Sequence, residues 1–213
     1  SENPWYLMPL AERNLLEEIH QSRITGEAPT SALADVLNAL EELHQLGFVH
    51  RDLKPQNVLL LDGTWRLTDF GLVLPMSSTT TKLTSTESAW GTAAYCAPEQ
   101  AIDFKGVSAA ADIYAFGCIL HDIFSGAARI PYARHTAAGA IGGIIEKCTE
   151  VKAERRFKSI KSVRGTLLSL LAASPQVHAS AKATEWASEL PSVANWPQEK
   201  AESFVRYLTN DAN

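Results

Sequence analysis

Two short polar blocks carry the side chains in this sequence that are best suited to chemistry. Residues 50–57 read HRDLKPQN, and residues 69–71 read DFG. Asp52 and Asp69 supply carboxylates and Asn57 supplies an amide, which are hard oxygen ligands of the kind that Mg²⁺ prefers. A carboxylate can also accept a proton from a hydroxyl nucleophile. The two blocks therefore predict a site where a magnesium-bound nucleotide and a hydroxyl group meet.

The local pattern around these blocks predicts the elements that hold them. Before the first block, apolar residues recur at helical spacing, namely Leu33, Val36, Leu37, Leu40 and Leu43. Residues 29–31 form a start signal for this helix and Gly47 a stop signal. Residues 48–49 then extend into the first block. Between the two blocks, residues 58–61 and 65–68 predict two short strands around a tight Asp-Gly turn.

The later part of the chain is predicted to be mostly helical. Residues 76–90 are rich in Ser and Thr with little apolar patterning, which is typical of a mobile loop. From residue 109 onward a helix is expected with one apolar stripe, made by Ile113, Phe116, Leu120 and Ile123. Residues 139–148 and 157–171 predict two more helices. Two polar, amphipathic helical patterns follow near 178–190 and 198–209.

Composition narrows the class of protein. The chain has 213 residues, of which 46% are hydrophobic and 20% charged, as in an ordinary globular domain or one lobe with an extension. Its net charge of −5 and the absence of a basic run argue against nucleic acid as a partner. Three cysteines without CxxC spacing favour a reducing compartment. No membrane-length apolar run and no signal peptide are found, so a cytoplasmic location is predicted.

Three further motifs follow the two blocks in a familiar order. Residues 91–99 read GTAAYCAPE, residues 112–117 read DIYAFG, and Arg156 follows. Together with HRDLKPQN and DFG, these motifs resemble the eukaryotic-type (Hanks-type) Ser/Thr protein kinases, with bacterial-type members nearest. Single motifs are weak evidence, but several in the family order are strong. The resemblance implies a mainly α fold, that of a kinase large lobe with short β-hairpins around the catalytic loop.

The resemblance also implies roles for individual residues and makes ATP and Mg²⁺ the expected cofactors. Asp52 would accept the proton of a substrate hydroxyl or orient it, and Lys54 would reach the γ-phosphate. Asn57 and Asp69 would hold Mg²⁺. Thr92, together with Lys54, is typical of Ser/Thr-directed members.

The adenine site implied by the resemblance lies near the start of the chain. Met8 falls at the gatekeeper position, Pro9 and Ala11 in the hinge, and Leu59 at the floor of the adenine pocket. No Gly-rich loop, strand Lys or helix Glu of a small lobe precedes residue 50. We therefore expect residues 1–12 to be a remnant of the last small-lobe strand and hinge, 13–174 the large lobe, and 175–213 a helical extension.

Other residues are expected to support the fold or its control. The resemblance implies a buried ion pair between Glu99 and Arg156, and an Asp112 that braces the catalytic loop. Arg51 would pair with a phosphate on residues 80–88. The alternative is that this loop is simply a Ser/Thr-rich disordered stretch. His44 is expected to be a packed or capping histidine. The GAIGG run at 139–143 is expected to be a close helix contact and not a phosphate loop, and Trp186 and Trp196 packing anchors.

The leading hypothesis for function is therefore an ATP-dependent protein Ser/Thr kinase that is active when joined to its small lobe. Its expected partners are ATP, a protein substrate, and the small lobe or another domain of the same protein. A truncated kinase-like binding or scaffold protein is the main alternative. A small-molecule phosphotransferase is a third, because a fold alone does not define a substrate. The APE segment argues against this third possibility, because it resembles a platform for peptide substrates.

Overall fold

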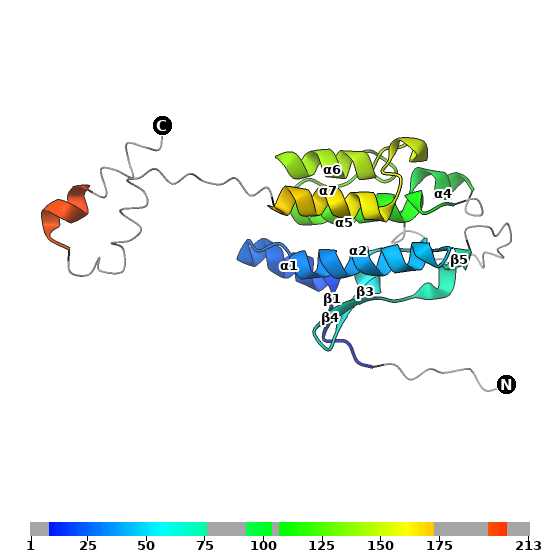
Figure 1. The fold of residues 1–213 in the computed structure, drawn as a ribbon, viewed down its shortest axis with the longest axis horizontal. Coiled ribbons are helices and arrows are strands. Elements are labelled where there is room, and N and C mark those ends of the chain that lie inside the picture. The colour runs from blue at the N-terminus through cyan, green and yellow to red at the C-terminus, as the bar shows by residue number, and fades with distance from the viewer. Residues whose placement is uncertain (1–8, 76–92, 104–106, 173–195, 204–213) are drawn as a thin grey trace. The chain divides into compact units, whose positions relative to one another are not determined.

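The computed structural model describes residues 9–75, 93–103, 107–172 and 196–203 (Figure 1). They belong to two units, one within residues 1–172 and one within residues 173–213. Met8, Thr92, Trp186 and the predicted loop at 76–90 lie outside the described residues, and so does the helical pattern near 178–190. The division of the chain into remnant, lobe and extension stays a prediction.

The centre of the first unit is helix α5, Ala110–Phe124. Every residue from Ala111 to His121 is buried, so the helix is covered on all sides. The predicted apolar stripe lies in or against the core, and because the helix is surrounded by other elements its remaining faces are buried as well. Helices α6, Ala140–Cys148, and α7, Ile160–Ala172, pack against each other, and α6 also packs on α5.

Glycine allows α5 and α6 to approach closely. A Cβ atom placed on Gly117 would lie 2.5 Å from Cys148 Cβ, which is inside van der Waals contact. The expected close contact of the GAIGG run has a different partner. A Cβ on Gly142 would lie 2.1 Å from the carbonyl oxygen of Ala137, in the preceding loop, so the contact is not with another helix. Gly139, with φ of 74°, only caps the start of α6.

Two further helices precede the HRD block. Helix α2, Thr30–Gln45, has Pro29 at its N-cap, and Gly47 follows its end with φ of 80°, as predicted. Helix α1, Leu15–Thr25, was not predicted from periodicity. Its start is nevertheless marked by a capping box, in which the Asn14 side chain accepts from the backbone of Glu17 and the Glu17 side chain accepts from the backbone of Asn14.

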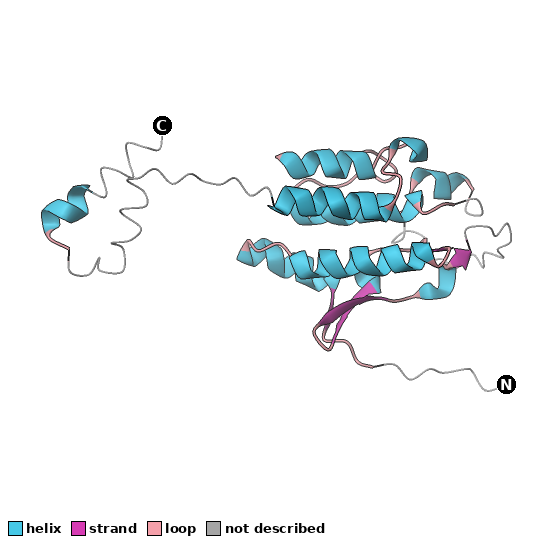
Figure 2. Ribbon diagram, in the orientation of Figure 1, coloured by secondary structure: helices cyan, strands magenta, loops and turns pink. Residues whose placement is uncertain are grey.

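The strands form two small antiparallel sheets (Figure 2). In the first sheet, β3, Val58–Leu61, lies between β1, Arg13–Asn14, and β4, Thr64–Leu67. Asp62 and Gly63 both have positive φ, as a two-residue hairpin turn requires. In the second sheet, β2, Phe48–Val49, pairs with β5, Leu74–Pro75.

The arrangement around α2 connects the sheet to the helical core. Helix α2 packs against β4 on one side and against α7 on the other (Figure 1). Short 3₁₀ turns at Pro55–Asn57, Phe70–Leu72 and Ala153–Arg155 and the short helix α4, Pro98–Ile102, complete the unit. The expectation of a mainly α fold with short β-hairpins around the HRD block is confirmed.

In the second unit the described residues 198–203 are helical. Trp196 precedes them, and Lys200 Nζ lies 5.3 Å from the centre of its ring, within range of a cation–π contact. Across the described parts of the chain, no helix has both the length and the apolar character needed to cross a membrane.

Candidate active site

Asp112, at the start of α5, fixes the backbone of the HRD block. Its carboxylate accepts hydrogen bonds from the backbone N–H of His50, at 2.9 Å to Oδ2, and of Arg51, at 2.8 Å to Oδ1. Arg51 has a φ of 71°, which a non-glycine residue adopts only when its surroundings hold it there. His44 Nε2 lies 2.8 Å from Asp112 Oδ2. The bracing role expected of Asp112 is confirmed, and the packed His44 belongs to the same network.

Asp52 lies next to a cation and an amide. Lys54 Nζ is 2.7 Å from Asp52 Oδ2, and Asn57 Nδ2 donates to the same oxygen at 3.1 Å and to the Asp52 carbonyl at 2.9 Å. Asp52 is only 8% exposed, whereas the Lys54 side chain is 20% exposed. A buried carboxylate that contacts two donors is held in one orientation.

The HRD and DFG blocks are joined through Asn57 and Thr68. The backbone N–H and the hydroxyl of Thr68 both donate to the Asn57 carbonyl oxygen, at 2.9 and 3.1 Å. His50 Nε2 lies 3.1 Å from the Thr68 carbonyl oxygen, and its ring centre lies 5.4 Å from that of Phe70. The position of Asp69, the next residue after Thr68, is therefore fixed relative to the first block.

The two predicted magnesium ligands have suitable chemistry for that ion. Asp69 is exposed and adopts a left-handed backbone conformation, φ 60° and ψ 63°. Asn57 uses its Nδ2 for the bonds to Asp52, so its Oδ1 is the atom that could bind a cation. Two oxygen ligands are the number that Mg²⁺ commonly takes from a protein when phosphates supply others. Among the described residues, no group of three or more His, Cys, Asp or Glu side chains could hold a metal ion.

The strand that follows the predicted hinge pairs with the strand that contains the predicted adenine floor. Asn14 pairs with Leu59 and Arg13 with Leu60, and the backbone N–H of Glu12 donates to the Leu60 carbonyl oxygen at 3.0 Å. In this antiparallel register the half-buried Leu59 lies opposite Asn14, and the segment that contains Pro9 and Ala11 precedes the paired residues, on the side of the Asp62-Gly63 turn. The role of these residues in nucleotide binding stays a prediction.

The segment that leads into α4 is attached to the HRD block by Gln100. Gln100 Nε2 donates to the Arg51 carbonyl oxygen at 2.8 Å, and Gln100 Oε1 accepts from the backbone N–H of Ala97 at 3.0 Å. Burial raises the pKa of the nearby Cys96 thiol to about 11, and the charges of Glu99 and Asp52 raise it further. The Cys96 thiol is thus neutral at ordinary pH. Gln100 was missed in the sequence, where no local pattern indicated its partner.

Comparison with known proteins agrees with this geometry. A family model described as "Protein kinase domain" matches residues 2–208. The chain therefore belongs to the protein kinase domain family, in its eukaryotic-type Ser/Thr group.

Named relatives come from several bacteria. Serine/threonine-protein kinase AfsK of Streptomyces griseus is 39% identical over 133 residues, which are 61% of this chain and 16% of that protein. Serine/threonine-protein kinase PknL of Mycobacterium tuberculosis is 36% identical over 58% of this chain and 31% of that protein. A probable serine/threonine-protein kinase PknB of Lactococcus lactis is 42% identical over 51% of this chain and 17% of that protein. The matches span less than a third of each of these relatives.

Proposed function

We propose that this chain supplies the large-lobe half of a protein kinase active site, and that it transfers the γ-phosphoryl group of ATP to Ser or Thr of a protein when joined to a small lobe. One observation carries the proposal. Asp52 is buried, contacts both Lys54 and Asn57, and lies on a loop whose backbone is held by the buried carboxylate of Asp112. Phosphoryl transfer depends mostly on such positioning and charge neutralisation.

In this proposal, Asp52 orients the substrate hydroxyl. Lys54 and Asn57 both contact Oδ2, so we assign Oδ1 as the oxygen that accepts the hydroxyl proton. The hydroxyl oxygen forms a bond to the γ-phosphorus as the bond from that phosphorus to its bridging oxygen breaks, and ADP leaves. Lys54 neutralises charge on the transferred group. Asn57 and Asp69 would hold Mg²⁺, which when bound neutralises the nucleotide phosphates.

The decisive test is phosphotransfer by the protein encoded by the complete reading frame that contains this chain, with Asp52→Asn as the matched variant. We expect the variant to keep its fold and to lose activity by about 10²–10⁴-fold, the usual contribution of a general base. Equal activity of the two proteins would contradict the assignment. Absence of transfer in both would instead support the alternative of a kinase-like binding or scaffold protein, which requires no proton acceptor at this position.

A protein substrate, a small-lobe partner and a cytoplasmic location also stay predictions. So do the catalytic role of Thr92, the gatekeeper role of Met8 and the phosphorylation of residues 80–88, which lie outside the described residues.

A further inference from the structure

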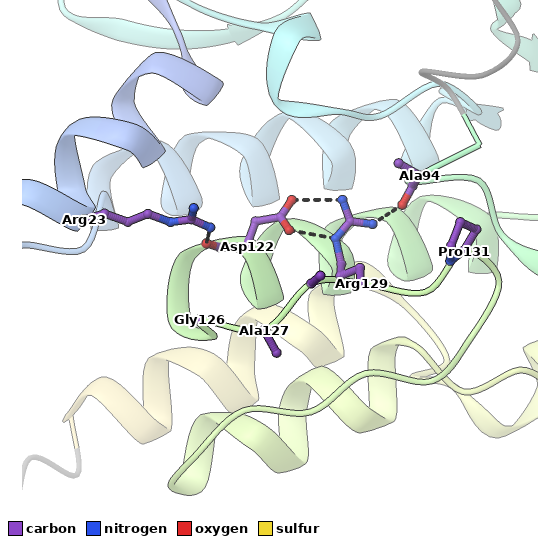
Figure 3. A pocket seen from close by; sticks show the side chains of 8 residues that line it. Arg23, Ala94, Asp122, Gly126, Ala127, Arg129 and Pro131 are labelled. Atoms are coloured by element: carbon purple, nitrogen blue, oxygen red, sulfur yellow. Dashed lines mark hydrogen bonds and ion pairs between the residues drawn. The ribbon is translucent and has the colours of Figure 1, made fainter.

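A cavity of about 400 Å³ lies next to the segment that leads into α4 (Figure 3). It is lined by Arg23 at the end of α1, Ala94, Asp122 at the end of α5, and Arg129 and Pro131 of the loop that follows. Among the described residues, none of the proposed catalytic residues Asp52, Lys54 and Asn57 lines it. Its walls therefore offer a separate set of charged groups beside the active site.

The only carboxylate among the described lining residues is engaged within the chain. Arg129 Nε lies 2.7 Å from Asp122 Oδ1 and Arg129 Nη2 lies 3.1 Å from Oδ2, so the pair is bidentate (Figure 3). The Tyr95 hydroxyl donates to Oδ2 at 2.7 Å. A cation from another molecule would have to compete with Arg129 for this carboxylate.

Arg129 is itself held firmly. Its Nη1 donates to the Ala94 carbonyl oxygen, and its guanidinium lies 4.2 Å from the centre of the Tyr95 ring. Its side chain is only 9% exposed. Burial and the adjacent Asp122 raise the pKa of Tyr95, so that its hydroxyl stays protonated and continues to donate.

The pocket has an excess of positive charge. Arg23 is exposed, and its Nη2 donates to the backbone carbonyl oxygen of Asp122 at 2.8 Å. The described lining thus contains two guanidinium groups and one carboxylate, which is already paired with Arg129. Guanidinium groups are well suited to binding carboxylates because their N–H donors form a planar fork.

The pocket also adjoins the place where a substrate would lie. Ala94 and Tyr95 lie just before Ala97, and Gln100 hydrogen-bonds both to Ala97 and to Arg51, the residue before Asp52. A peptide whose hydroxyl is at Asp52 would run along this segment. A neighbouring side chain of that peptide could then enter the pocket.

We infer that this pocket binds an Asp or Glu side chain near the acceptor residue of the protein substrate. Arg129 disfavours a basic side chain there because it already pairs with the Asp122 carboxylate. The inference rests on the proposed kinase function. It makes Arg23 and Arg129 determinants of specificity and assigns them no part in phosphoryl transfer.

The test measures peptide binding without turnover. In each fluorescent peptide, Ala replaces the acceptor Ser, and the flanking positions carry Asp, Asn or Arg. Fluorescence anisotropy gives the Kd of each peptide for the full-length protein that contains this chain. We expect the Asp peptide to bind about tenfold more tightly than the Arg peptide, with a ratio that falls as salt rises. Arg23→Gln should reduce the ratio to about threefold, and Arg155→Gln, an exposed site outside the pocket, should leave it unchanged.

The second variant tests the exclusion of basic residues. Arg129→Ala frees Asp122 and should reverse the order, so that the Arg peptide binds more tightly. If this variant does not fold, Arg23→Gln alone decides the inference. Equal binding of the three peptides to the unaltered protein, no binding of any peptide, or a ratio unaffected by Arg23→Gln would overturn it.

Phosphotransfer to the matching Ser peptides separates this inference from the proposed function. A charge preference in binding with no transfer contradicts the kinase activity and leaves the pocket assignment standing. Transfer at equal rates to all the Ser peptides, with equal Kd values, contradicts the pocket assignment and leaves the kinase activity standing.

Discussion

Arg156 forms a bidentate ion pair with Glu99, at 2.6 Å from Nη1 to Oε1 and 2.7 Å from Nη2 to Oε2. The remaining donors of the guanidinium reach the carbonyl oxygens of Ala110, Glu150 and Val151. The Arg156 side chain is fully buried and that of Glu99 is 30% exposed, so the expected ion pair is confirmed. It links α4 to the start of α5 and to the loop after α6.

Arg156→Ala should destabilise the fold strongly. The change leaves Glu99 without its cation and removes the donors of three backbone carbonyls, and breaking a buried pair in this way costs about 3–5 kcal/mol. Thermal unfolding should show a fall in Tm on the order of 10 °C. Arg155→Ala, at the exposed neighbouring position, is the control and should change Tm little. An unchanged Tm for Arg156→Ala would mean that the pair contributes no stability.

Gly117→Ala should destabilise the packing between α5 and α6. The new methyl group would meet Cys148 Cβ at 2.5 Å and Thr149 Cγ2 at 2.8 Å, and overpacking of this kind costs about 1–3 kcal/mol. Gly165→Ala in α7 is the matched control, because its Cβ would meet nothing within 4 Å. The control should raise the free energy of unfolding by up to about 1 kcal/mol through helix propensity. Urea unfolding of both variants measures the two effects, and equal changes would contradict the close approach.

The buried His135 should make the fold sensitive to acid. Burial is the main cause that lowers its pKa to about 4, the neighbouring His121 and Arg129 lower it further, and Asp122 opposes them. Burial also lowers the pKa of His121, whose ring centre lies 5.1 Å from that of His135. The unfolded chain therefore binds protons more readily than the folded one.

The resulting stability is present above pH 6.5 and is lost as pH falls towards 4. The pKa of His135 predicts a loss of about 2 kcal/mol at pH 5 relative to neutral pH. Urea unfolding at pH 7.5 and pH 5, compared with His135→Asn, isolates this contribution from that of the carboxylates. A variant that loses as much stability between the two pH values as the unaltered protein would show that His135 does not titrate in this way.

Lys54→Met should reduce catalysis with little effect on the fold. The side chain is partly exposed, and Asp52 keeps its two hydrogen-bonding contacts with Asn57, so the free energy of unfolding should change by less than about 1 kcal/mol. Loss of a charge that stabilises the transferred group should lower the kcat of the full-length protein that contains this chain by about 10²–10³-fold. Unimpaired kcat would remove Lys54 from the proposed mechanism.

The local elements around the site could be predicted because their signals lie close together in the sequence. Helix α2 was recognised from the spacing of its apolar residues, and the β3–β4 hairpin from two short strand-like runs on either side of Asp62-Gly63. Helix α1 was missed because its apolar residues are few, although the capping box at Asn14 marked its start. The uniform burial of α5 could not be predicted, because it depends on which elements surround that helix.

By itself, the sequence determined the family and the types of the candidate catalytic side chains, since the HRD, DFG and APE blocks are contiguous and their order is read directly. Only the tertiary structure decided which groups hold those side chains in place. Asp112 meets His44 across 68 positions and Arg51 across 61, and Gln100 meets Arg51 across 49. Arg129 likewise donates to the carbonyl oxygen of Ala94 across 35 positions. Such contacts have no periodicity along the chain, because they arise only when packing brings distant segments together.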